Sequence, residues 1–310
     1  MEKCGIFSGE ASVALAKDIC DNLGCEMGKV NITHFSDGEF GLSFEESIRG
    51  TNVFLVQSTY PNADNLMELL LMVDAAKRAS AKSIVAVVPY FGWARQDKKD
   101  KPRVSIGAKL VADMLSVAGI DRLMTMDLHA DQEQGFFDIP VDHLYASSVL
   151  LPYIRSLNLP NLVISSADVG GSKRASGYAK ALNVPLILCN KHRDKPNEVA
   201  SMQIIGDCMG KDVVLIDDMV DTAGTIVKAA NLIKESGAAS VRAVASHCVM
   251  SGLASDRVME SALEEIVFTD SIPFNKVCPK LKQLSVAPVF SEAIRRVLEN
   301  ESISDLYLIK

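Results

Sequence analysis

A short segment around residue 217 carries two adjacent carboxylates and a small, hydroxyl-rich turn. The apolar run Val213–Ile216 leads into Asp217 and Asp218, and the turn Asp221-Thr-Ala-Gly-Thr225 then opens a helical pattern. A carboxylate pair at the end of a strand can accept hydrogen bonds from the vicinal hydroxyls of a ribose. The free N–H groups at the start of the next helix suit a phosphate monoester. The spacing therefore predicts a pentose phosphate site, whereas an acidic helix cap alone would leave the carboxylate pair unexplained.

Three further polar groups come directly after apolar runs. His129 follows one such run, Asp168 follows a second, and the basic tripeptide Lys191-His-Arg193 follows a third. Ligands of parallel α/β sheets bind beyond the carboxyl ends of the strands, so each group is a candidate for a site. A single histidine is more often an ordinary hydrogen-bonding residue, and a basic tripeptide is more often an exposed turn. The residues alone leave both interpretations open.

Apolar segments alternate with amphipathic segments along the chain, which is typical of βαβ units and a parallel sheet. We expect strands at Val53–Gln57, Ile84–Pro89, Leu123–Met126, Leu162–Ser165, Leu186–Leu188, Val213–Ile216, Val241–Ser246 and Ile266–Thr269. We expect helices at Leu66–Ala79, Ile106–Val117, Lys173–Leu182, Thr225–Ser236 and Phe290–Leu298. Length and pattern together predict an α/β protein with two tandem parallel-sheet domains.

The composition limits the classes of partner. Hydrophobic residues make up 48% of the 310 residues, and a chain of this length usually divides into two domains. The net charge of −7 argues against nucleic acid and against an anionic membrane as partners. Seven cysteines without a Cys-x-x-Cys pair indicate neither a disulfide framework nor a zinc site. No apolar run approaches the roughly 20 residues needed to cross a bilayer, so we expect a cytoplasmic protein.

Two common nucleotide-binding motifs, the P-loop and the glycine-rich dinucleotide fingerprint, are absent from the sequence. The Asp217–Thr225 loop instead resembles the loop shared by type I phosphoribosyltransferases and ribose-phosphate pyrophosphokinases. Further segments resemble the second family: Phe35–Glu39, Asn65–Met72, Pro89–Asp97, Met126–Ala130 and Gly135–Asp142. From about residue 5 to the C-terminus, the chain is identified as a member of that family. The resemblance implies two type I phosphoribosyltransferase-like domains, at residues 1–146 and 147–310.

The resemblance also implies a reaction and a set of site residues. The reaction is transfer of the β,γ-diphosphoryl group of ATP to the C1 hydroxyl of ribose 5-phosphate, with Mg²⁺ as cofactor. The implied catalytic residues are Lys191 and Arg193, and the implied metal residues are His129 and Asp168. The implied ATP-binding residues are Phe35, Asp37, Gly38, Glu39, Arg95, Gln96 and Arg174, with the first four serving a neighbouring subunit's ATP. The implied ribose 5-phosphate residues are Arg193, Asp217, Asp218, Asp221, Thr222, Ala223, Gly224 and Thr225.

Assembly and regulation follow from the same resemblance. The family forms homo-oligomers, commonly hexamers, and many members respond to phosphate and ADP. Five positions resemble the regulatory phosphate site: Ser47, Arg49, Ser80, Ser302 and Ser304. Two alternatives stay open from the sequence. One is a base-using phosphoribosyltransferase with the same loop, and the other is a catalytically silent regulatory subunit.

Overall fold

The computed structural model describes residues 3–192 and 201–306, which form two compact units. The first unit comprises residues 3–145, 271–273 and 286–306, and the second comprises the described residues of 146–270 and 274–285. Among the described residues, no helix is both long enough and apolar enough to span a membrane.

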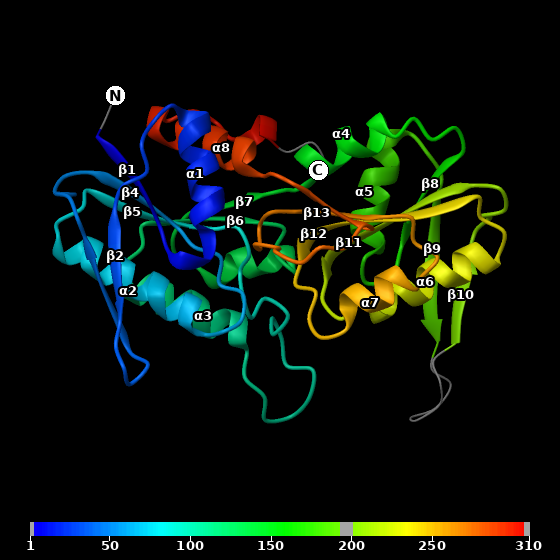
Figure 1. The fold of residues 1–310 in the computed structure, drawn as a ribbon, viewed down its shortest axis with the longest axis horizontal. Coiled ribbons are helices and arrows are strands. Elements are labelled where there is room, and N and C mark those ends of the chain that lie inside the picture. The colour runs from blue at the N-terminus through cyan, green and yellow to red at the C-terminus, as the bar shows by residue number, and fades with distance from the viewer. Residues whose placement is uncertain (1–2, 193–200, 307–310) are drawn as a thin grey trace. The chain divides into compact units, whose positions relative to one another are not determined.

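The first unit is built around a five-stranded parallel sheet with the strand order β1-β4-β5-β6-β7. Its strands are β1 (Cys4–Ser8), β4 (Asn52–Val56), β5 (Ser83–Val88), β6 (Arg122–Met126) and β7 (Val141–Leu144). Its helices are α1 (Val13–Leu23), α2 (Asp64–Arg78), α3 (Gly107–Ala118) and α8 (Ala287–Glu299). Figure 1 shows α2 and α3 on one face of this sheet, and α1 beside α8 on the other. The late helix α8 therefore belongs to the first unit.

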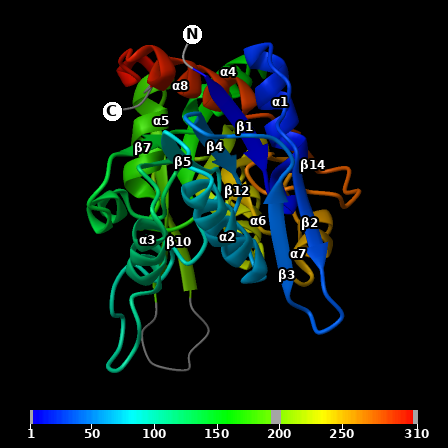
Figure 2. The same ribbon diagram turned by 90° about the vertical axis from the view of Figure 1, so that its left-hand side faces the viewer.

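A separate antiparallel hairpin of the first unit joins β2 (Val30–His34) to β3 (Phe40–Phe44). Figure 2 shows the hairpin in blue, with its turn at the end farther from β1. The hairpin lies against the core only in part: Val30, Leu42 and Phe44 pack on buried residues, while the remaining side chains are more exposed.

The second unit is built around a seven-stranded sheet with the order β10-β9-β8-β11-β12-β13-β14, in which only β10 runs antiparallel to its neighbour among the described strands. The strands are β8 (Leu162–Ser166), β9 (Leu186–His192), β10 (Ser201–Ile205), β11 (Asp212–Val220), β12 (Ser240–Cys248), β13 (Ile266–Thr269) and β14 (Leu281–Leu284). The helices are α4 (Ser147–Ser156), α5 (Ser172–Leu182), α6 (Gly224–Glu235) and α7 (Ala254–Met259). The central strand β11 is buried along its first half, which explains its unbroken apolar sequence.

All eight expected strands and all five expected helices are present, although several boundaries differ. The longest extension is in β11, which runs to Val220 because it stays paired with β12 as far as Cys248. Strand β9 runs to His192, because β10 pairs antiparallel with it. Asp217 and Asp218 therefore lie in the second half of strand β11, and Lys191 lies within strand β9 and not after it.

Candidate active site

An adjacent pair of carboxylates and a third from the next strand lie toward the carboxyl end of the second unit's sheet. Asp217 and Asp218 lie near the end of β11, and Asp168 follows the neighbouring strand β8. The pKa of Asp217 is raised well above its usual range, chiefly because the side chain is buried, and further because the charges of Asp218 and Asp168 repel it. Adjacent carboxylates at a strand end are suited to accept hydrogen bonds from a hydroxyl donor such as a sugar.

The turn after β11 presents backbone donors at the start of helix α6. Ala223 adopts a left-handed conformation (φ 60°) and forms the N-terminal boundary of the helix. A Cβ atom added at Gly224 would approach only Thr222 Oγ1, at 3.7 Å, so the space above the first turn is open. Helix α6 has 12 residues, so its free N–H groups and its dipole can act together on an anion. The geometry matches the phosphate half of the predicted pentose site.

Two residues that the sequence analysis did not identify hold this turn in place. The Ser251 hydroxyl donates a hydrogen bond to Asp221 Oδ1. The Arg257 guanidinium donates to the carbonyl oxygen of Thr222 at 2.7 Å, measured from Nη1. Both residues come from the segment after β12, about 30 positions along the chain. No local motif marks them, because only the pairing of β11 with β12 brings the two segments together.

The predicted adenine-binding residues occupy the turn of the β2–β3 hairpin. The Phe35 amide donates to the Glu39 carbonyl at 2.8 Å, and the Glu39 amide donates to Asp37 Oδ1 at 3.0 Å. Gly38 has a φ of 96°, a conformation that favours glycine. The Phe35 side chain is 53% exposed, so its ring is free to stack on a flat ligand. The structure thus brings these four residues into one turn.

The remaining predicted ATP-binding residues are on both units. Arg95 and Gln96 are exposed on the segment after β5, where the Gln96 carbonyl also accepts a hydrogen bond from the Ala108 amide at the start of α3. Arg174 lies in the first turn of α5 in the second unit, six residues after Asp168. The Asp168 carboxylate itself accepts a hydrogen bond from the Gly171 amide at 3.0 Å.

His129 lies in the first unit, on the segment that follows β6. Its side chain is exposed, whereas the two residues before it are buried. The expectation that it follows the strand directly is correct. Within the described residues, no group of three or more histidine, cysteine or acidic side chains is arranged to hold a metal ion by itself. Mg²⁺ commonly retains waters and takes further oxygen ligands from substrate phosphates, so a small protein ligand set fits this ion.

The predicted catalytic pair is described in part. Lys191 is the next-to-last residue of β9, and its backbone pairs with Met202 of β10. Arg193 lies outside the described residues.

Comparisons with known proteins give a consistent result over nearly the whole chain. Residues 4–119 match the N-terminal domain of ribose phosphate pyrophosphokinase, and residues 173–308 match the phosphoribosyl synthetase-associated domain. A ribose-phosphate pyrophosphokinase of Porphyromonas gingivalis is 66% identical over 303 residues, covering 97% of each chain. The Helicobacter pylori enzyme of the same name is 54% identical over 97% of this chain and 95% of its own. The chain belongs to the ribose-phosphate pyrophosphokinase family.

A solved structure of the family confirms the fold class. The phosphoribosylpyrophosphate synthetase of Mycobacterium smegmatis superposes with a TM-score of 0.91 at 40% identity, covering 96% of this chain and all of that one. The α/β fold with two parallel-sheet units, predicted from the sequence, is therefore correct.

The residues that resemble the family's regulatory phosphate positions form two pairs in the first unit. Arg49 Nη1 donates to Ser80 Oγ at 3.1 Å, and Ser302 Oγ donates to Ser304 Oγ at 3.0 Å. Ser47 is exposed, and its carbonyl oxygen accepts a hydrogen bond from Lys3.

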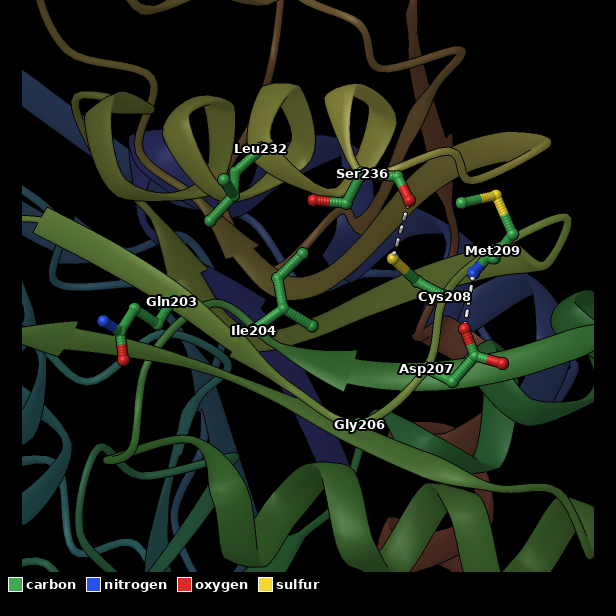
Figure 3. A pocket seen from close by; sticks show the side chains of 8 residues that line it. All are labelled: Gln203, Ile204, Gly206, Asp207, Cys208, Met209, Leu232 and Ser236. Carbon is green, nitrogen blue, oxygen red and sulfur yellow. Dashed lines mark hydrogen bonds between the residues drawn. The ribbon is translucent and has the colours of Figure 1, made fainter.

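An open pocket of the second unit contains none of the residues predicted from the family resemblance. Figure 3 shows its lining: Gln203, Ile204, Gly206, Asp207, Cys208, Met209, Leu232 and Ser236. The Cys208 thiol donates to the Ser236 carbonyl at 3.8 Å, and the pKa of Cys208 is raised, chiefly by burial. A thiol in this state is a poor nucleophile, so the pocket adds no chemistry to the reaction of the family.

Proposed function

We propose that this chain transfers the β,γ-diphosphoryl group of ATP to the C1 hydroxyl of ribose 5-phosphate, giving 5-phosphoribosyl 1-diphosphate and AMP. The observation that carries the proposal is the carboxylate pair of β11 followed at once by the open N-terminus of α6, in a chain 66% identical to a ribose-phosphate pyrophosphokinase. The pair and the turn can hold the two ends of one pentose phosphate. The product would serve nucleotide biosynthesis.

The pentose is bound by the second unit. The N–H groups of Thr222, Gly224 and Thr225 bind the 5-phosphate, while Asp217 and Asp218 accept hydrogen bonds from the ribose hydroxyls. Asp221 acts indirectly, because its carboxylate holds the turn through Ser251. Burial and mutual repulsion make the carboxylates strong acceptors, and a bound hydroxyl donor or cation relieves that repulsion.

The nucleotide is bound by residues of the segment after β5, of the first turn of α5 and of a neighbouring subunit's hairpin turn. Arg95, Gln96 and Arg174 contact the triphosphate. From the neighbouring subunit, Phe35 stacks on the adenine, while Asp37, Gly38 and Glu39 contact its edge. His129 is the proposed metal residue of the first unit, partly through water, and Asp168 is that of the second. When bound, Mg²⁺ neutralises phosphate charge and favours attack at phosphorus.

Catalysis requires alignment and charge neutralisation more than covalent help from the protein. The C1 hydroxyl attacks the β-phosphorus in line with the departing AMP, and Lys191 and Arg193 stabilise negative charge on the group in transfer. Cations that act on such charge where water is excluded typically lower the barrier by several kcal/mol.

Assembly into a homo-oligomer is part of the proposal, and a hexamer is the expected size. The supporting observation is an exposed apolar stripe on helix α3, where Leu110, Met114 and Val117 are 58%, 37% and 82% exposed. These residues lie on one face of the helix, and contiguous exposed apolar surface is typical of protein interfaces. The pairs Arg49–Ser80 and Ser302–Ser304 are proposed to bind regulatory phosphate, together with Ser47. We further propose a cytoplasmic location and domains at 1–146 and 147–310, although residues 286–306 of the second belong to the first compact unit.

A product assay tests the reaction. Protein, ribose 5-phosphate and Mg-ATP should give AMP and a diphosphorylated pentose in equal amounts, measured by ³¹P NMR and nucleotide chromatography. Formation of ADP with a singly phosphorylated C1 would identify a simple kinase and refute the proposal. The matched control is Lys191→Ala, which should retain ATP binding while AMP formation falls about 10²-fold or more.

A further inference from the structure

The backbone on both sides of His129 is fixed by consecutive hydrogen bonds. The Asp127 amide donates to the Leu144 carbonyl at 3.0 Å. The Leu128 amide donates to His143 Nε2 at 2.9 Å, and the Ala130 amide donates to Glu133 Oε1 at 2.9 Å. Three of the four amides in this short segment therefore have defined acceptors.

The two side-chain acceptors are buried below the exposed His129. His143 is 2% exposed and Glu133 is 1% exposed, and they belong to β7 and to the 3₁₀ turn Asp131–Phe136. Asp127 has a φ of 40°, a positive value that aspartate adopts more readily than most residues. The segment is thus a turn held by hydrogen bonds on both sides of His129, whose side chain is exposed.

His143 is oriented by two contacts of its own. Because a backbone amide can only donate, Nε2 is the acceptor and the ring proton lies on Nδ1. The Tyr145 ring packs against the imidazole with a centroid distance of 4.5 Å, whereas the nearby side-chain nitrogen of Gln134 donates to the Asp131 carbonyl. The ring is therefore held in one orientation, with Nε2 directed at the Leu128 amide.

We propose that His143 is a positioning residue of the pyrophosphokinase: through the Leu128 amide, it sets the orientation in which His129 meets Mg-ATP. The inference rests on the proposed function, which places His129 at the Mg-ATP site. His143 touches neither substrate, and it acts only through the backbone that carries His129. Partners that orient a metal-site or substrate-site residue typically change affinity or activity by 10- to 100-fold when removed.

Two isosteric amides separate this role from a general packing role. Glutamine at position 143 places its amide oxygen near the position of Nε2, whereas asparagine places its amide near Nδ1 and cannot reach the Leu128 N–H. We expect His143→Asn to lower kcat/KM for Mg-ATP about 10-fold and His143→Gln to lower it by about 3-fold at most. The KM for ribose 5-phosphate should change less than 2-fold in both. Equal losses in the two variants would overturn the proposal.

A double-mutant cycle with His129→Ala decides whether His143 acts through His129. In the His129→Ala protein, His143→Asn should lower kcat/KM for Mg-ATP less than 2-fold, because the residue being positioned is gone. If His129→Ala is itself damaging and His143→Asn still costs about 10-fold there, His143 acts elsewhere and the positioning role is refuted. If His129→Ala leaves kcat/KM for Mg-ATP near normal, the assignment of His129 to the ATP site has failed, and the inference fails with it. Circular dichroism melts verify folding. Should His143→Asn not fold, Tyr145→Leu removes the ring that packs on the imidazole and leaves Nε2 in place. This variant should lower kcat/KM for Mg-ATP about 3-fold alone and have no effect in the His129→Ala protein.

Discussion

The ion pair between Arg122 and Asp142 allows a quantitative test of how the first unit holds the strands that carry the site. Arg122 begins β6, which leads to His129, and Asp142 lies in β7 beside His143. Arg122 Nη1 donates to both carboxylate oxygens of Asp142, at 2.8 and 2.9 Å. The side chains are 31% and 8% exposed, respectively, so the two partners differ in their access to water.

That difference predicts unequal costs for removing each partner. Arg122→Met keeps most of the aliphatic stem but leaves a buried carboxylate without its cation. We expect the free energy of unfolding to fall by about 3 kcal/mol, the lower end of the range for breaking a buried ion pair. Asp142→Asn leaves the arginine, which can reach water and still donate to the amide oxygen, so we expect a loss of about 1 kcal/mol. The double variant Arg122→Met/Asp142→Leu should lie within about 1 kcal/mol of the wild type.

The pH dependence of these variants has a defined sign. Burial raises the pKa of Asp142 even though Arg122 lowers it, so the ionised carboxyl costs stability above its folded pKa. Removing Arg122 raises that pKa further. As pH falls from 7 to 5, the Arg122→Met protein should therefore recover stability relative to the wild type, whereas Asp142→Asn should not.

Urea unfolding followed by tryptophan fluorescence measures these effects. The chain has a single tryptophan, Trp93, which packs against the core of the first unit, so its signal reports on the unit that contains the ion pair. Equal losses for Arg122→Met and Asp142→Asn, or a loss in Arg122→Met that does not change with pH, would refute the reasoning from burial.

Three further predictions concern the pentose site and the last helix. Asp217→Asn should abolish activity but raise the melting temperature in chelator at pH 8 by about 2–4 °C, or about 1 kcal/mol. Calorimetry should show this gain shrinking toward pH 5, because the raised pKa of Asp217 confines the cost of its charge to higher pH. Arg257→Lys, which weakens the bond to the Thr222 carbonyl by about 1 kcal/mol, should raise the KM for ribose 5-phosphate about 5-fold in steady-state assays, and an equal rise in the KM for ATP would contradict it. Glu292→Gln should lower the free energy of unfolding by at most about 1 kcal/mol at pH 7, because Arg295 and Arg296 lower the pKa of this carboxyl from 4.5 to about 2. Urea titrations should show this difference disappear as pH falls from about 4.5 to 2.

Local patterns in the sequence determined much of the fold. The apolar run before Asp217 and the turn Asp221–Thr225 lie together in residues 213–225, so a strand, a carboxylate pair and a helix start were all predictable from one segment. Helices α2, α3, α5 and α6 have regular apolar faces that pack on a sheet, and this periodicity marks them in the sequence.

Other elements were not predicted. Strands β2 and β3 alternate apolar with polar or small residues, but each alternation covers only five residues of a partly buried hairpin. Strand β1 has just five residues, and α7 has just six. The extension of β11 to Val220 depends on its pairing with β12, because hydrogen bonds from a neighbouring strand can hold polar residues in an extended conformation.

The candidate site divides in the same way. The chemical groups of the site were evident from the sequence, because side-chain chemistry is a local property. They are carboxylates, an aromatic ring and basic residues. Their supports were not evident: Arg257 reaches Thr222 across 35 positions, and His143 reaches Leu128 across 15. The raised pKa of Asp217 likewise depends on burial and on Asp168, 49 residues earlier in the chain. Burial and long-range hydrogen bonds arise only when strands distant in sequence become neighbours in a sheet, so only the tertiary structure decided how the site is held.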